Sequence, residues 1–314
     1  MRLGIIGLGI MGERLLRVAL AHPGVEVSGV WDPSGAAAAR LEGIAPGMRL
    51  AATADEVTQA SEVVYVASPP ASHIAHGQAV LAAGRALFLE KPLASDVASA
   101  RAFVASAKGQ RAAVNFPMAS SPAVAQLMAW MPGVGPLQRI EIAMEFATWP
   151  RGWQQGAAAW LSKRAEGGFT REVASHFLFL AGRIGGALAL QEGRASYPDG
   201  DGSEVAVEAR LRAGPVPVTL SGRVGGVEAD ERNLCLLEGE RGSIRLRDWS
   251  IAERLEDGEW RPAADAVANE RMRPVTLGGQ LDKLSALTRG EPTKLATLEE
   301  ALAVQVVVEG MLAG

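Results

Sequence analysis

The segment GLGIMG at residues 7–12 constrains the fold of this chain more than any other stretch. Its glycines, Gly7, Gly9 and Gly12, have the spacing G-x-G-x-x-G, immediately after an apolar run typical of a β-strand and at the start of a helical pattern. There they permit a tight turn, close approach of the backbone to a pyrophosphate, and close packing of helix on sheet. We expect a dinucleotide to bind at this turn; the alternative is a glycine-rich turn in a fold that binds no nucleotide.

A second strand-like run ends at Asp32, twenty residues after Gly12. A carboxylate there can accept hydrogen bonds from the adenosine ribose hydroxyls, and it would repel the 2′-phosphate of NADP. The next basic residue is Arg40, on the following expected helix. The sequence therefore favours NAD(H) over NADP(H), and the reach of Arg40 leaves NADP(H) as the alternative.

The first third of the chain alternates strand-like and helix-like patterns. Strands are expected at residues 2–6, 25–31, 62–68, 85–90 and 111–116, and helices near 11–21, 34–42, 72–83 and 95–107. This repeated β–α–β order predicts a Rossmann-type, doubly wound parallel sheet. The nearly continuous hydrophobic character of the strands agrees with a sheet that is covered on both faces.

The pattern changes after about residue 116. Partly alternating strands are expected at residues 138–146, 203–213, 217–224, 233–240 and 242–248, and helices at about 170–183, 279–289 and 297–312. The last helix begins with a Thr N-cap, Thr297, and a Glu at N3. We therefore expect two domains: a dinucleotide-binding domain at residues 1–116, and an α+β domain with a large, mostly antiparallel sheet at residues 117–314.

Composition excludes several classes of protein. Of 314 residues, 48% are hydrophobic and 21% charged, and the formal net charge of −4 comes without a basic stripe, so a nucleic-acid partner is not expected. Cys235 is the only cysteine, which rules out an intrachain disulfide and a cysteine-based zinc cage and agrees with a cytoplasmic setting. Four prolines interrupt the longest uncharged run, 112–138, so no membrane span is expected. No metal site is expected either.

Three further segments resemble the Gfo/Idh/MocA family of oxidoreductases, the relatives of glucose–fructose oxidoreductase and inositol dehydrogenase. They are SPPASH at 68–73, LEKPLA at 89–94, which holds the E-K-P motif, and GGFTREVASH at 167–176. The resemblance covers essentially the whole chain. It implies a Rossmann domain followed by an α+β domain with an open antiparallel sheet, and a homo-oligomer, a dimer or tetramer packed through that sheet.

The resemblance also implies roles for individual residues. The family's active-site lysine falls on Lys91, its acidic position on Glu172, here Glu rather than the commoner Asp, and its catalytic histidine on His176. A cis bond before Pro92 is also implied. The cofactor contacts that we expect are Gly7, Gly9, Ile10, Met11, Gly12, Asp32, Ser68, Pro69, His73, Glu90 and Lys91. Phe169 replaces the third glycine of the usual triplet, and NFPMASS (115–121) stands where the family often has an arginine.

These residue types suit the oxidation of a secondary alcohol, in which a hydride goes to nicotinamide and a proton to a base. An imidazole ordinarily titrates near neutrality, which suits this proton transfer. Glu172, four residues before His176, can orient the ring on the same helix face. The ammonium of Lys91, at the carboxyl end of a parallel strand, can stabilise alkoxide-like charge on the reacting oxygen. The alternatives are a buried core histidine and a solvated loop lysine.

The remaining candidates are open to structural explanations. His73 can contact the cofactor or cap and pack its helix. Trp153 and Trp160 can line a sugar pocket or fill the domain core, and Arg171 can bind a substrate carboxylate or belong to a solvated charge cluster.

Three functions follow from these patterns. The leading one is an NAD-dependent oxidoreductase acting on a sugar, polyol or related small molecule. The second is a glycosidase that uses bound NAD for transient oxidation. The third is a non-catalytic sensor of dinucleotide, which the joint presence of Lys91, Glu172 and His176 disfavours.

Overall fold

The computed structural model describes all residues from 1 to 314, and these form two compact units. The first unit contains residues 1–119 and 277–302, and the second contains residues 120–276 and 303–314. Helices α9 (Asn269–Thr288) and α10 (Leu298–Ala313) therefore each contribute residues to both units. The return of residues 277–302 to the first unit is a difference from the continuous boundaries predicted from the sequence.

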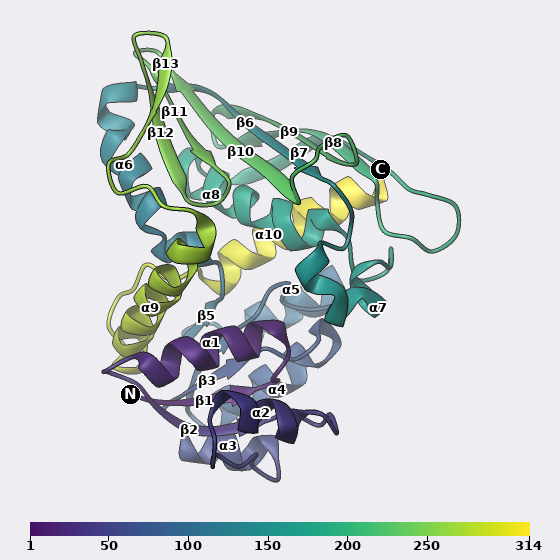
Figure 1. Ribbon diagram of the computed structural model, residues 1–314, viewed down its shortest axis with the longest axis vertical. Helices are drawn as coiled ribbons and strands as arrows, with labels where there is room; N and C mark the ends of the chain where they lie inside the picture. The colour runs from purple at the N-terminus through teal and green to yellow at the C-terminus, as the bar shows by residue number, and fades with distance from the viewer. The chain divides into compact units, whose positions relative to one another are not determined.

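A five-stranded parallel sheet forms the centre of the first unit (Figure 1). Its strands are β1 (Arg2–Ile6), β2 (Glu26–Trp31), β3 (Val63–Val66), β4 (Ala86–Leu89) and β5 (Ala112–Val114), in the order β2-β1-β3-β4-β5. Strands β3 and β4 are buried along their whole length, as their continuous hydrophobic sequences predict. The predicted Rossmann-type sheet is confirmed.

Five helices accompany this sheet: α1 (Ile10–Ala21), α2 (Ala37–Ile44), α3 (Ala54–Ala60), α4 (Pro70–Ala82) and α5 (Val97–Ser106). The sequence patterns did not predict α3, a helix of seven residues whose N-cap Thr53 accepts a hydrogen bond from the backbone N–H of Glu56. The core of the unit includes Leu277, Leu281, Leu284 and Leu295 from the C-terminal part of the chain. Burial of these four leucines explains why residues 277–302 belong to the first unit.

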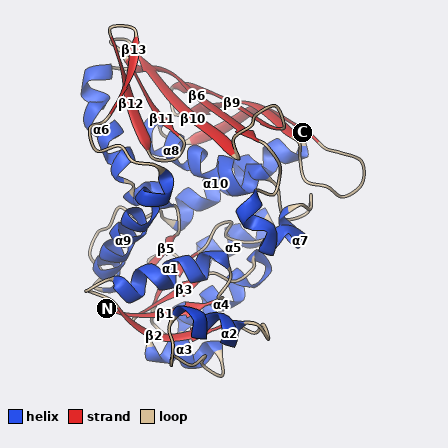
Figure 2. Ribbon diagram, viewed as in Figure 1, coloured by secondary structure: helices blue, strands red, loops and turns tan.

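The second unit contains an eight-stranded, mostly antiparallel sheet in the order β13-β12-β11-β10-β6-β9-β8-β7. Its strands are β6 (Leu137–Phe146), β7 (Leu188–Ser196), β8 (Ala206–Ala213), β9 (Val216–Val224), β10 (Glu231–Gly239), β11 (Ser243–Arg247), β12 (Ile251–Glu256) and β13 (Glu259–Pro262). Only β6 and β9 pair in parallel. Buried and exposed residues alternate along β8 and β9, and Figure 2 shows helices α8 and α10 on one face of the sheet. The predicted open antiparallel sheet is confirmed.

The helical segments of this half of the chain are η1 (Pro117–Ser120), α6 (Pro122–Val134), η2 (Gly152–Ala157), α7 (Ala158–Leu161), η3 (Thr170–Ala174) and α8 (Ser175–Gly185). The proline-rich run thus contains a helix: Ser121 caps α6, and Pro122 occupies its first position, where no N–H is needed. The predicted cap of α10 is confirmed, because Thr297 and Glu300 exchange reciprocal side-chain and backbone hydrogen bonds. No helix of the chain combines the length and the apolarity that a membrane span requires.

Candidate functional site

The turn between β1 and α1 requires glycine for two different reasons. Gly7 has φ +95°, and a Cβ on it would lie 2.6 Å from the backbone of Ala67 and Ser68. A Cβ on Gly12 would lie 2.0 Å from the carbonyl oxygen of Gly7. At Gly9, by contrast, a Cβ would meet nothing within 4 Å, and no side chain caps α1 there. The first N–H groups of α1 can therefore bind a phosphate that approaches over Gly9.

The turn lies where the strand order of the parallel sheet reverses. Strand β1 pairs with β2 on one side and with β3 on the other, so the loops after β1 and β3 meet at the carboxyl edge of the sheet. Ser68 and Pro69, two of the predicted cofactor contacts, directly follow β3, and Pro69 is the N-cap of α4. Open α/β sheets bind ligands at such a switch point, so the geometry of this edge suits a dinucleotide.

Asp32 is bound to the glycine turn by its own carboxylate. Oδ2 accepts a hydrogen bond of 2.6 Å from the backbone N–H of Leu8, and Oδ1 accepts one of 2.8 Å from that of Ser34. Burial acts to raise the pKa of Asp32, but these hydrogen bonds and the charge of Arg40 outweigh it and lower the pKa. Arg40 also donates to the carbonyl of Leu8, so a negative and a positive side chain both lie beside this turn.

The E-K-P segment is held by a buried hydrogen-bond network in the first unit. Glu90 accepts hydrogen bonds from the hydroxyl of Tyr65 and the amide of Asn115, and its Oε2 accepts one of 3.2 Å from the backbone N–H of Lys91. Burial and the nearby charge of Glu90 raise the pKa of Tyr65 well above its usual value, so the phenol remains a donor. The expected cis bond between Lys91 and Pro92 is present. The network fixes the chain at the point where Lys91 leaves the sheet.

His73 connects two loops at the same sheet edge. Its Nδ1 lies 2.8 Å from the carbonyl oxygen of Pro92, and its Nε2 lies 2.7 Å from that of Ser68. Burial lowers the pKa of His73, although both carbonyls favour the protonated ring. This geometry gives His73 a role in positioning the loops after β3 and β4, while direct contact with a cofactor stays a prediction.

In the second unit, the segment that begins with Gly167 and Gly168 is closely packed. A Cβ on Gly167 would lie 2.1 Å from the carbonyl oxygen of Leu161. Gly168 has φ +98°, and a Cβ on it would lie 2.0 Å from the buried carboxylate of Glu204, which accepts a hydrogen bond of 2.7 Å from the backbone N–H of Thr170. The two glycines thus allow the chain to enter the helical segment that carries the predicted catalytic pair.

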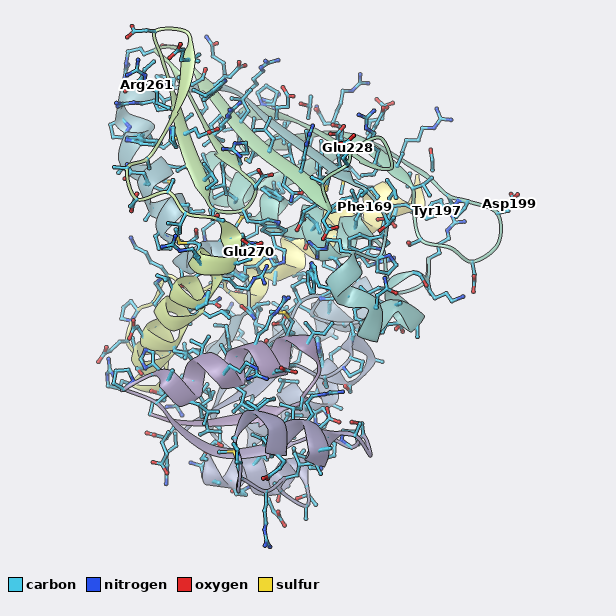
Figure 3. All side chains as sticks on the ribbon, viewed as in Figure 1. Phe169, Tyr197, Asp199, Glu228, Arg261 and Glu270 are labelled. Carbon is cyan, nitrogen blue, oxygen red and sulfur yellow. The ribbon has the colours of Figure 1, made fainter.

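Phe169 is a core residue of the second unit. Its side chain is fully buried, with its ring centroid 5.2 Å from that of Phe146 and 6.1 Å from that of Trp149. The ring also occupies the space that a Cβ on Gly222 would need. Figure 3 labels Phe169 on the helix-covered side of the sheet. Packing therefore explains why phenylalanine replaces a glycine here.

Glu172 and His176 lie on two helical segments that follow one another directly, a π-helical turn and an α-helix. Glu172 belongs to a π-helical turn, Thr170–Ala174, and His176 lies in the first turn of α8. π-Helical turns are rare in proteins, and those that occur often lie at functional sites. His176 is 8% exposed, and its ring meets that of Trp249 edge-on at 5.4 Å between centroids. The predicted orientation of His176 by Glu172 stays a prediction, and Trp249 is a contact that the sequence did not reveal.

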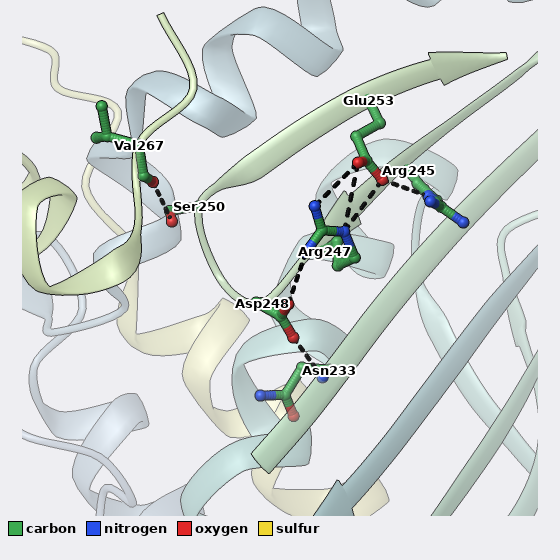
Figure 4. Close-up of polar contacts among 7 residues, drawn as sticks. All are labelled: Asn233, Arg245, Arg247, Asp248, Ser250, Glu253 and Val267. Atoms are coloured by element: carbon green, nitrogen blue, oxygen red, sulfur yellow. Dashed lines mark hydrogen bonds and ion pairs between the residues drawn. The ribbon is translucent and has the colours of Figure 1, made fainter. Parts of the chain in front are cut away.

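Trp249 is held against His176 by an unusual backbone conformation. Asp248 and Trp249, in the connection between β11 and β12, have φ values of 46° and 71°, which non-glycine residues rarely adopt. Figure 4 shows the bonds that hold this connection: the carboxylate of Asp248 binds the backbone N–H of Asn233 and the side chain of Arg247, and Ser250 binds the carbonyl of Val267. Such local strain is found where a side chain must be positioned for function.

A buried ion pair continues from Trp249. The carboxylate of Glu231 accepts hydrogen bonds from the indole N–H of Trp249, from the amide of Asn233 and from Arg151, the last at 2.9–3.0 Å. Arg151 is only 5% exposed, and its guanidinium carbon lies 4.6 Å from the ring centroid of Trp153. No sequence spacing relates Arg151 to Glu231, eighty residues later, so only the fold reveals this cluster.

Two further predicted substrate residues have different surroundings. Arg171 forms a two-bond ion pair with Glu309, at 2.7 and 2.8 Å, and also donates to the carbonyls of Arg164 and Gly167. These contacts supply a structural reason for Arg171. Trp160 is half-buried in α7. A substrate role for either residue stays a prediction.

The first unit has a parallel sheet with a glycine turn at its switch point, and the second unit has an open, mostly antiparallel sheet. This architecture suits a two-domain dinucleotide-binding protein. Comparison with protein families agrees: residues 1–116 match the Gfo/Idh/MocA family, described as an oxidoreductase family with an NAD-binding Rossmann fold. The match agrees with the resemblance expected from the motifs, and the matched family binds NAD.

Solved structures share the fold of the whole chain. An oxidoreductase from Agrobacterium radiobacter, in complex with NAD⁺, L-tartaric acid and magnesium, superposes with a TM-score of 0.84 at 14% identity, over 100% of this chain and 96% of that one. UDP-N-acetylglucosamine 3-dehydrogenase from Acidithiobacillus ferrooxidans gives 0.76 at 17% identity, with 99% of each chain covered. A putative myo-inositol dehydrogenase from Sinorhizobium meliloti gives 0.78 at 17% identity, over 100% and 97%. At identities of 14–17%, these similarities show that the chain shares the fold of the three proteins.

The comparison with curated proteins found no match.

Proposed function

We propose that this protein is an NAD-dependent dehydrogenase or reductase that acts on a CH–OH group, or the corresponding carbonyl, of a sugar, polyol or related compound. The observation that carries the proposal is the buried network of Tyr65, Glu90 and Asn115, which fixes Lys91 at the same sheet edge as the glycine turn. Two of the similar structures are a UDP-N-acetylglucosamine dehydrogenase and a putative myo-inositol dehydrogenase, which supports this substrate class.

The proposed roles follow from the chemistry of the side chains. Bound NAD supplies a hydride acceptor at nicotinamide C4. The ammonium of Lys91 binds the reacting oxygen and stabilises the negative charge that develops on it. The imidazole of His176 exchanges the hydroxyl proton, with Glu172 and Trp249 fixing the ring. The edge-on ring contact with Trp249 supports a fixed orientation for His176.

The proposed cofactor preference is NAD(H) over NADP(H). Asp32 lies directly after β2, and two backbone N–H groups and Arg40 keep its carboxylate charged. A charged carboxylate can accept the ribose hydroxyls and repels a 2′-phosphate. Arg40 lies beside Asp32, and its positive charge would favour the 2′-phosphate of NADP(H).

We also propose that the protein forms a homo-oligomer through the uncovered face of the eight-stranded sheet. Helices cover only the other face (Figure 1), and the uncovered face carries cross-strand charge pairs such as Arg139 with Glu238 and Arg223 with Glu145. Light scattering after size exclusion should give two or four times the chain mass of 32.8 kDa. A monomeric mass across the micromolar range would contradict this assembly.

The experiment that tests the catalytic proposal combines a substrate panel with matched variants. Sugars, polyols and inositols are screened for NADH formation with the wild-type protein, and Lys91→Met and His176→Gln are assayed on the best substrate. We expect each variant to lose about a hundredfold or more in kcat while NADH still binds. Lys108→Met, an exposed lysine, is the control. Unchanged turnover in the Lys91 and His176 variants would contradict the proposed roles.

Two other results of the same screen would point to the other functions. Cleavage of chromogenic glycosides without net NADH formation would indicate a glycosidase that uses NAD transiently. Binding of NADH with neither oxidation nor cleavage across the panel would indicate a dinucleotide sensor.

A further inference from the structure

Arg273 is a half-buried cation that forms no ion pair with a carboxylate of the protein. It lies in the part of α9 that belongs to the second unit, one turn after Glu270, which Figure 3 labels at the start of this helix. Its guanidinium carbon lies 5.9 Å from the ring centroid of Trp153, and the side chain forms no hydrogen bond or ion pair with the rest of the chain. A cation that is partly removed from water normally pairs with an anion, so this arrangement needs an explanation.

The neighbouring charges do not neutralise Arg273. Arg151, whose guanidinium also lies near the ring of Trp153, has its own charge matched by the two-bond ion pair with Glu231. Burial and repulsion by Arg151 lower the pKa of Arg273, and Glu231 and the exposed Glu270 oppose this shift only in part. Glu231 is thus already bonded to Arg151, and no carboxylate forms an ion pair with Arg273.

We propose that Arg273 and Trp153 form a subsite for an anionic group, a carboxylate or a phosphate, on the substrate. The planar guanidinium can bind either group through two parallel hydrogen bonds. The ring of Trp153, 40% exposed, offers an apolar face to the C–H groups of a sugar-like compound.

Contacts within the second unit link this subsite to His176. Trp153 stacks on Arg151, Arg151 pairs with Glu231, Glu231 accepts the indole N–H of Trp249, and Trp249 meets the ring of His176. An anionic group bound at Arg273 would thus be linked by these contacts to the ring of His176, the proposed proton-transfer residue. The inference rests on the proposed function and narrows its substrate class to anionic sugars and hydroxy acids.

The test measures binding rather than turnover. Isothermal titration of the wild-type protein, saturated with NAD⁺, is carried out with glucose, glucuronate and glucose 6-phosphate, so that the neutral, carboxylate and phosphate forms of one sugar are compared. The same titrations use Arg273→Gln, and Arg271→Gln serves as the control, because Arg271 is exposed, lies two residues away on the same helix and forms no ion pair.

We expect at least one of the two anionic sugars to bind the wild-type protein and Arg271→Gln about tenfold or more tightly than Arg273→Gln, because a charge-assisted hydrogen-bonded pair is lost. Glucose should not distinguish the three proteins. If glucuronate loses more affinity in Arg273→Gln, the subsite binds a carboxylate; if glucose 6-phosphate loses more, it binds a phosphate.

If neither anion binds the wild-type protein more tightly than Arg273→Gln, the subsite is wrong, whatever the protein catalyses. If the binding difference is found but no compound yields NADH in the screening panel, extended to anionic sugars and hydroxy acids, the subsite stands and the proposed oxidoreductase activity is contradicted. The two proposals therefore fail on different measurements.

Discussion

Asp32 is the residue to which we assign the preference for NAD(H) over NADP(H). Its carboxylate and the guanidinium of Arg40 lie beside the same turn, one suited to ribose hydroxyls and the other to a phosphate. Asp32→Asn should therefore increase the affinity for NADPH relative to NADH by about tenfold or more, since a repulsive charge is removed and Arg40 remains.

Fluorescence titrations with NADH and NADPH measure this ratio. The double variant Asp32→Asn/Arg40→Gln is the control, because the gain should disappear when no cation remains to bind the 2′-phosphate. An unchanged ratio in Asp32→Asn would mean that another residue selects the cofactor.

Cys235, in the centre of β10, provides a prediction that depends on pH. Burial raises the pKa of its thiol to about 12, so the folded protein keeps the thiol protonated. Iodoacetamide at about pH 9, where an ordinary cysteine is largely thiolate, should leave native Cys235 unmodified and modify it after unfolding.

The raised pKa of Cys235 also determines how the free energy of unfolding changes with pH. Above the ordinary cysteine pKa of about 8.5 only the unfolded chain ionises, so this group's contribution to the free energy of unfolding falls as the pH rises toward 12. Rapid alkylation of the native protein, measured by intact mass, would show that the thiol is accessible.

At the scale of elements, the segment before η3 and α8 depends on close backbone packing at Gly167. A Cβ at this position would lie 2.1 Å from the carbonyl oxygen of Leu161, and backbone atoms cannot move aside as a side chain can. Gly167→Ala should lower the free energy of unfolding by about 2 kcal/mol or more. Gly156→Ala is the matched control, since a Cβ there meets nothing within 4 Å, and it should change stability by less than about 0.5 kcal/mol. Urea denaturation measures both, and equal effects would contradict the packing argument.

Elements with strong local signals were predictable from the sequence, and elements defined by tertiary contacts were not. Strand β1 and the capped helix α10 were found within one residue of their expected bounds, because hydrophobic runs and a capping box are local patterns. Helix α3 is too short for periodicity to show, and the prolines of α6 concealed a helix that begins at Pro122. The π-helical turn Thr170–Ala174 has no sequence signature that separates it from α8.

The same distinction applies to the candidate site. The positions of Gly7, Asp32 and Lys91 follow from motifs that lie at strand ends, so their place at the sheet edge was predictable. The partners of His176 and Arg151 come from strands and turns tens of residues away, and no spacing rule predicts Trp249 or Glu231. Sequence motifs therefore indicated the chemistry, and the fold supplied the residues that position it.

At the scale of the whole chain, the central proposal is that this protein transfers a hydride between NAD and a small hydroxy or carbonyl compound. The family of residues 1–116 and the fold of the full chain support an oxidoreductase, and the identity of the compound is what the proposals narrow.

The most direct test follows a labelled hydride. The protein is incubated with NADH deuterated at C4 and a panel of keto sugars, oxidised inositols and their anionic derivatives. The masses of the products are then measured by mass spectrometry. The account predicts that at least one product carries deuterium at the new CH–OH carbon, with matching oxidation of the cofactor. Retention of all deuterium in the cofactor, with every compound either unchanged or cleaved without net redox change, would contradict it.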